Sequence, residues 1–154
     1  MEKVLTGRDV NWGNQTLKTR SKDSFTSNEV MDAYFKGKKD GLEFSQKVLL
    51  KQFSANIDSS LKYTAQVVDK LTDLSFKPIN AYLRLKSVQH FDVLLTLPEE
   101  DILNEDILHI YSFLGKFEKK VHDEMFAINY TLSSHNESFN EQLLALDGFV
   151  LKSR

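Results

Sequence analysis

The chain contains no cysteine. This absence excludes disulfide bonds, thiolate metal sites and cysteine nucleophiles, and it suits a reducing compartment, so we expect a cytoplasmic protein. No stretch approaches the roughly 18 consecutive apolar residues that a membrane-spanning helix requires. Residues 1–22 also lack the apolar run that forms the core of a signal peptide. The sequence therefore predicts no membrane partner.

The chain also lacks an excess of charge of one sign. Its 20 Lys and Arg residues are balanced by 22 Asp and Glu residues, giving a net charge of −2 and a pI near 6.1. A uniformly basic surface for binding phosphates is therefore absent, which disfavours nucleic acid as a partner. The apolar fraction of 41% and the charged fraction of 27% are typical of a globular protein, and 154 residues fit one domain.

Proline is scarce, with only Pro78 and Pro98, so nothing interrupts a helix in the first half of the chain. The stretch FTSNEV contains Thr26 followed three residues later by Glu29, which is the pattern of a capping box. This pattern predicts that a helix begins there. An amphipathic face then continues with helical spacing toward residue 74. It includes Leu50, Phe53, Ile57, Thr64, Val67, Leu71 and Leu74.

A single helix from about 27 to 74 would be roughly 70 Å long, whereas a domain of this size is only about 30 Å across. Two alternatives remain open. Either the helix is continuous and extends beyond its domain, or it breaks or bends within residues 54–60. In the second case Asp58 or Ser59 would cap the following helix.

Glycine is also scarce, with six in the chain, yet two of them lie within the predicted helix. Ala33, Gly37, Gly41 and Ser45 recur every four residues, which places them on one side of a helix. Each helical glycine costs roughly 1 kcal/mol relative to alanine. We interpret this row of small residues as a surface that another helix or strand approaches closely, with a local turn as the alternative.

Residues 1–25 are polar and without periodicity, and we expect an extended N-terminal arm that is ordered only where it lies on a neighbour. The only tryptophan, Trp12, lies in this arm. One interpretation is that Trp12 folds back onto its own domain. The other is that it anchors the arm in a partner, because tryptophan is enriched at binding hot spots.

The remainder of the chain, residues 26–154, is expected to form one α+β domain that is helical over 26–75 and contains a sheet over 76–154. Alternating apolar residues predict strands at 79–88 and 91–98, and a helical pattern follows at 104–122. The later segments predict a strand, a short helix and a last strand, at 125–133, 139–146 and 148–152. The fold class is therefore a long helix followed by a small sheet of about four strands in ββαβ(α)β order.

Asp92 lies within the apolar strand HFDVLLTLP. The order of elements over about residues 75 to 132 resembles the small core of nucleotidyltransferases. In that family a Gly-Ser turn precedes a strand carrying D-x-D, and the two carboxylates bind a metal. Here no Gly-Ser precedes the strand, and the second carboxylate position is Leu94. One carboxylate does not assemble a two-metal site, so a hydrogen-bonded strand acid is the simpler interpretation of Asp92.

These patterns predict an interaction or assembly protein that needs no cofactor and is not an enzyme. A helix longer than its domain exposes apolar surface unless a second copy covers it, so a homo-oligomer is expected. The alternative is a divergent nucleotidyltransferase-like protein with Asp92 as a metal ligand. The residues assigned to the interface are Trp12, Ala33, Gly37, Gly41, Ser45, Leu50, Phe53 and Ile57.

Overall fold

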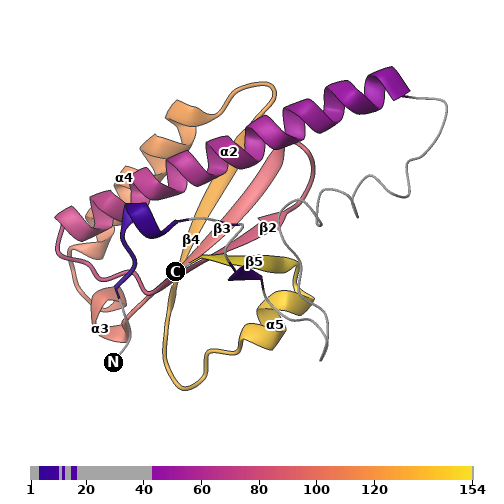
Figure 1. Cartoon of the computed structure of the whole chain (residues 1–154). Coiled ribbons are helices and arrows are strands. Elements are labelled where there is room, and N and C mark those ends of the chain that lie inside the picture. The colour runs from indigo at the N-terminus through magenta and orange to yellow at the C-terminus, as the bar shows by residue number, and fades with distance from the viewer. Residues whose placement is uncertain (1–3, 11, 13–14, 17–42, 154) are drawn as a thin grey trace.

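The computed structural model describes residues 4–10, 12, 15–16 and 43–153, and these form an α+β fold (Figure 1). Within this part the sheet has five strands in the order β1-β5-β2-β3-β4. All neighbouring strands are antiparallel except β3 and β4, which are parallel, so the sheet is mixed. The long helix α2 and the helix α4 lie together on one face of this sheet.

Helix α2 (Glu43–Asp73) is continuous over 31 residues, so the alternative with a break within residues 54–60 is wrong. Polar residues in that stretch are used inside the helix instead of capping a new one. Asn56 is buried, and its Nδ2 donates hydrogen bonds of 2.8 Å to the carbonyls of Val88 and Met125. Ser60 is also buried, and its hydroxyl donates to the carbonyl of Ile57. The start predicted at Thr26 lies outside the described residues.

A left-handed residue ends α2. Ser75 has φ of 69°, and its amide donates to the carbonyl of Thr72. The next amide, that of Phe76, donates to the carbonyl of Leu71 at 2.9 Å. This pair of bonds forms a Schellman motif, and both Phe76 and Leu71 are buried, as the motif's hydrophobic contact requires. Pro78 then turns the chain into the sheet.

The hairpin predicted between residues 79 and 98 is confirmed. It consists of β2 (Asn80–Leu85) and β3 (His90–Leu97), which pair antiparallel across a turn at residues 86–89. The short helix α3 (Glu99–Ile102) and α4 (Ile107–Val121) then lead to β4 (Ala127–Ser134), which joins β3 in parallel. The chain ends with α5 (Glu141–Leu146) and β5 (Phe149–Ser153), in the predicted chain order.

The two faces of the sheet are covered unequally. The face toward α2 and α4 carries the main core, which includes Phe91, Val93 and Leu95 of β3. The opposite face carries a smaller cluster of Tyr82 and Phe149 with Ala145 of α5. A β-bulge beside Leu83 and Arg84 lets β5 direct Phe149 to that face while Leu151 faces the main core. The rest of the second face remains more open.

The described residues of the expected N-terminal arm pack against the domain. A 3₁₀ turn, η1 (Gly7–Asp9), contacts α2, and the amide of Gly7 donates to the Asp69 carboxylate at 2.8 Å. Leu5 and Val10 are buried in the main core. Strand β1 (Gln15–Thr16) then pairs with β5 and forms one border of the sheet. These residues therefore contribute to the core of their own chain.

Candidate functional site

The residues assigned to an interface from the sequence fall into three groups. Ala33, Gly37 and Gly41 lie outside the described residues, as does the side chain of Ser45. Trp12, Phe53 and Ile57 are all buried within the main core of their own chain, at 1%, 0% and 8% exposure. Leu50 is exposed on α2, at 40%. Of the described members, only Leu50 presents its side chain at the surface.

Trp12 occupies the first of the two positions left open by the sequence. Its indole Nε1 donates a hydrogen bond of 3.1 Å to the hydroxyl of Ser60 on α2. Phe53 packs edge-on against Phe91 of β3, with ring centroids 6.2 Å apart. The helical face that the sequence placed at an interface is therefore covered, from Phe53 onward, by the sheet and the N-terminal segment.

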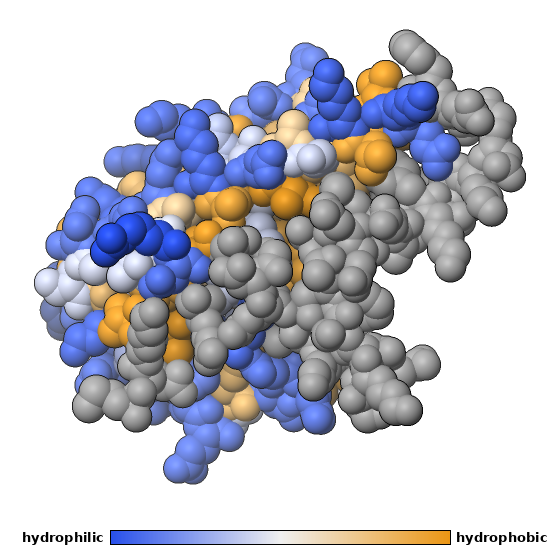
Figure 2. Space-filling view, viewed as in Figure 1, coloured by the Kyte–Doolittle hydropathy of each residue, from blue (hydrophilic) through white to orange (hydrophobic). Residues whose placement is uncertain are grey.

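Exposed apolar side chains gather at the N-terminal end of α2. Val48, Leu49 and Leu50 are 53%, 42% and 40% exposed, and we call these three residues the α2 patch. Figure 2 shows apolar surface at this end of the helix, at the upper right of the view. In Figure 1 the same end of α2 extends past the strands. The patch continues the buried stripe beyond the point where the sheet supports it.

Asp92 faces cations. Its Oδ2 accepts hydrogen bonds of 2.7 and 3.0 Å from the guanidinium of Arg84, and Lys86 Nζ lies 3.8 Å away. Arg84 also donates to the carbonyl of Asp147 and stacks over the ring of Phe149. Within the described residues no three His, Asp or Glu side chains come together as a metal would require. The carboxylate partners that a metal role for Asp92 needs are therefore missing from this part of the chain.

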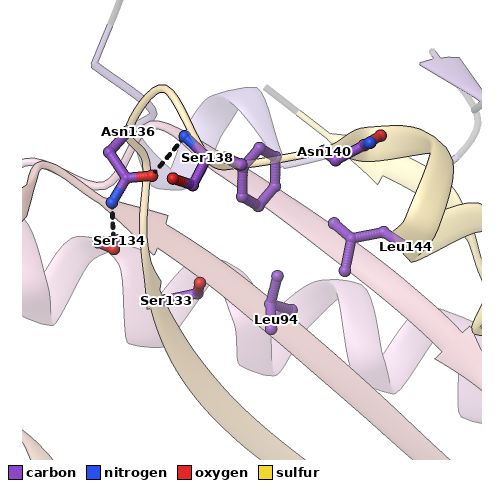
Figure 3. Close-up of a pocket in the computed structure, with 8 residues that line it drawn as sticks. Leu94, Ser133, Ser134, Asn136, Ser138, Asn140 and Leu144 are labelled. Carbon is purple, nitrogen blue, oxygen red and sulfur yellow. Dashed lines mark hydrogen bonds between the residues drawn. The ribbon is translucent and has the colours of Figure 1, made fainter.

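A shallow pocket of about 320 Å³ lies on the open face of the sheet (Figure 3). Its floor is apolar, from Leu94, Phe139 and Leu144, and its rim is formed by serine and asparagine side chains. The Asn136 side chain is engaged locally, because Oδ1 accepts from the Ser138 amide and Nδ2 donates to Ser134 Oγ. None of the residues that line the pocket carries a charge, so the lining provides neither an acid nor a base for catalysis. Sequence periodicity gave no signal for this pocket.

A polar network beside the pocket attaches α5 to the sheet. Glu141 accepts a hydrogen bond of 2.7 Å from the buried Tyr82 hydroxyl and forms an ion pair with Lys152. Burial raises the pKa of Glu141, but the hydrogen bonds from Lys152 and Tyr82 outweigh it, so the net pKa lies below its ordinary value. The lowered pKa and the two partners indicate that the ionised carboxylate stabilises the position of α5.

Tyr130 of β4 lies in the main core. Burial raises the pKa of its phenol far above the ordinary value, and the hydroxyl lies 3.2 Å from Thr64 Oγ1 on α2. The phenol therefore stays protonated at neutral pH and serves as a hydrogen-bonding group between β4 and α2. Its backbone amide has a separate partner, the Glu118 carboxylate of α4, at 2.8 Å.

Comparisons with protein-family models, with curated proteins and with solved structures each found no significant match. In the described part of the chain, no helix has the length and apolar character needed to cross a membrane. The candidate functional site is therefore argued from the geometry of the α2 patch alone.

Proposed function

We propose that the chain is a non-enzymatic assembly protein that self-associates through the N-terminal part of α2. The observation that carries the proposal is the exposure of Val48, Leu49 and Leu50, three consecutive apolar residues on a helix that extends past its sheet. At about 1.5 Å per residue, the 31 residues of α2 span roughly 46 Å. A contiguous apolar surface of this kind marks an interaction site.

A second copy of the chain is the partner that fits this surface. Helix packing around a two-fold axis brings the same residues of both copies together, so the patch would cover itself. Each of the three side chains is about half exposed, and covering it contributes roughly 1 kcal/mol. The flanking Lys47 and Lys51 are exposed and long enough to keep their ammonium groups in water while their stems lie along the interface.

The test is the mass of the full chain in solution, measured by sedimentation equilibrium over a wide concentration range. The variant Leu49→Glu with Leu50→Glu places charges in the patch and is expected to weaken self-association at least tenfold. The matched control is Leu146→Glu on α5, where the native side chain is 81% exposed and lies outside the patch. Equal association of the patch variant and the wild-type chain would refute the proposed role of α2.

The N-terminal segment does not provide a cleaner test by deletion. Leu5, Val10 and Trp12 are buried in the main core, so removing this segment would open the core and destabilise the fold. Substitutions at the exposed patch leave these contacts unchanged, and the free energy of unfolding of each variant serves as the check on folding.

A further inference from the structure

The strand β4 forms one border of the sheet, because it pairs with β3 and with no other strand among the described residues. The amides of Ala127 and His135 donate toward β3, so the alternate residues Ile128, Tyr130, Leu132 and Ser134 direct their backbone groups outward. One of these amides, that of Tyr130, donates to Glu118 at 2.8 Å. We call the outward backbone groups from Tyr130 to Ser134 the β4 edge.

The β4 edge has none of the usual protection against strand pairing. The eight residues of β4 read AINYTLSS and include no charged residue and no proline. Proteins commonly prevent edge pairing with charged side chains, proline or very short edge strands. The opposite border differs, because β5 is covered there by the two-residue strand β1. A long uncharged edge is therefore available on the β4 side only.

Helix α4 presents an apolar row beside the same edge. Leu108 and Tyr111 are 70% and 48% exposed, and a Cβ added at Gly115 would meet nothing within 4 Å. Leu108, Tyr111, Gly115 and Glu118 follow one another at helical spacings of three and four. Since Glu118 contacts the β4 edge, this row lies on the side of α4 that flanks the edge. We call Leu108, Tyr111 and Gly115 the α4 row.

We propose that the β4 edge and the α4 row together bind a second copy of the chain, with the two β4 strands antiparallel and centred on Leu132. Neutral strands pair without repulsion in this arrangement, and the exposed apolar side chains of both α4 helices become covered. The same surface of each copy meets itself around a two-fold axis, which is the commonest interface of homodimers. The two five-stranded sheets then form one continuous sheet.

The backbone groups match in this register. The amide and carbonyl of Leu132 meet those of Leu132 in the second copy, and the amide of Ser134 meets the carbonyl of Tyr130. The hydrogen bond between Glu118 and Tyr130 stays intact, because the register does not use the Tyr130 amide. The Glu118 carboxylate occupies the next position of the ladder and therefore ends the pairing there.

Gly115 lies where the two helices approach. Two residues along β4 from Tyr130 advance the strand by about 6.6 Å, which corresponds to roughly four residues of helix. Leu132 therefore lies beside the turn of α4 that contains Gly115, one turn before Glu118. A glycine at the two-fold axis lets the two helix backbones come close, as small residues do at helix crossings.

Charge substitutions on the open face of β4 test the register directly. In the proposed pairing Thr131 lies opposite Ser133 of the second copy, at a non-hydrogen-bonded position. The double variant Thr131→Lys with Ser133→Lys places like charges opposite each other and is expected to weaken dimerisation at least tenfold. Thr131→Lys with Ser133→Glu places opposite charges there and is expected to dimerise at least as strongly as the wild-type chain.

The control and the α2 patch are separated by working in the Leu49→Glu, Leu50→Glu background, so that association through α2 does not contribute. Sedimentation equilibrium gives the dissociation constants, and urea unfolding at low concentration checks that both charge variants fold equally well. The proposal is refuted by equal dissociation constants for the Lys/Lys and Lys/Glu variants, or by a chain that stays at monomer mass up to millimolar concentration.

The absence of cysteine provides a second, independent measurement. Chains carrying Thr131→Cys are mixed with chains carrying Ser133→Cys in the same background and oxidised. The Cα separation of about 4.5 Å at a non-hydrogen-bonded pair lies within disulfide range, so the mixture is expected to form a cross-linked heterodimer. The matched control replaces Ser133→Cys with Leu146→Cys. Cross-linking no faster with Ser133→Cys than with this control refutes the register.

Discussion

The indole Nε1 of Trp12 donates a hydrogen bond to Ser60 Oγ across 3.1 Å, and both side chains are buried. The two residues lie 48 positions apart in the chain, so this bond ties the N-terminal segment to the middle of α2. Ser60 in turn donates to the carbonyl of Ile57. The segment before α2 is therefore anchored by a specific buried polar contact in addition to apolar packing.

Removing the acceptor of this bond is expected to destabilise the fold. Ser60→Ala leaves the buried indole N–H without its partner, which costs about 1–3 kcal/mol of the free energy of unfolding. Trp12→Ala removes the whole ring from the core and costs about 3–5 kcal/mol. Urea unfolding measures both changes, and Val4→Ala, at a side chain 37% exposed, is the control, expected within about 0.5 kcal/mol of wild type. A Ser60→Ala variant as stable as the control would contradict a structural role for the bond.

Asn56 is expected to be the least replaceable polar residue of α2. Its Nδ2 supplies hydrogen bonds to the carbonyls of both Val88 and Met125, and its Oδ1 accepts from Gln52. Asn56→Asp exchanges the donor for a negatively charged acceptor facing two carbonyls, which we expect to cost more than Asn56→Ala, itself about 2–3 kcal/mol. Thermal and urea unfolding rank the two variants, with the exposed Asp58→Ala as control. The reverse ranking would show that the side chain is not held by these carbonyls.

Local patterns in the sequence predict most of the second half of the fold. The alternation around Ala81 and Leu83 and the helical spacing from Ile107 to Val121 each reflect one buried face, and the elements appear close to the expected bounds. The continuity of α2 was not predictable in the same way. Asn56 and Ser60 look like helix-ending residues until their partners, which come from distant parts of the chain, are known.

The candidate surfaces were predicted less well, for a related reason. The spacing of Leu50, Phe53 and Ile57 correctly indicates one apolar face, but it does not say where the sheet stops covering that face. That boundary lies between Phe53 and Leu50. The β4 edge was invisible in the sequence, because a strand becomes an edge only through the order in which strands pair, and β4 joins β3 after a crossover through α4.

The same substitution at two glycines is expected to have opposite effects. At Gly115 in α4 an added Cβ meets nothing, so Gly115→Ala is expected to stabilise the fold by about 0.5–1 kcal/mol through higher helix propensity. At Gly7 an added Cβ would lie 2.3 Å from an Asp69 carboxylate oxygen, which accepts the Gly7 amide hydrogen bond through its other oxygen. Gly7→Ala is therefore expected to destabilise the docked N-terminal segment. Differential scanning calorimetry measures both shifts, and equal shifts of the same sign would contradict this account.

The ionised form of Glu141 is expected to stabilise the attachment of α5 in a pH-dependent way. Because its pKa is lower in the folded state than in the unfolded chain, the stabilisation is fully present above the unfolded-state pKa. It is lost as the pH falls through the folded-state pKa, where the carboxylate of the folded protein becomes protonated. Glu141→Gln retains an acceptor for Tyr82 but removes the charge that pairs with Lys152.

The free energy of unfolding of wild type and Glu141→Gln, measured by urea titration from neutral to acidic pH, checks this dependence. The difference between the two proteins is expected to be small, because the Glu141 side chain is 40% exposed and solvent screens the pair. It should be constant near neutral pH and shrink as the solution is acidified. Lys152→Met serves as the matched variant, since it removes the same ion pair from the other side. A difference that stays constant across the acidic range would show that the charge of Glu141 does not stabilise the fold.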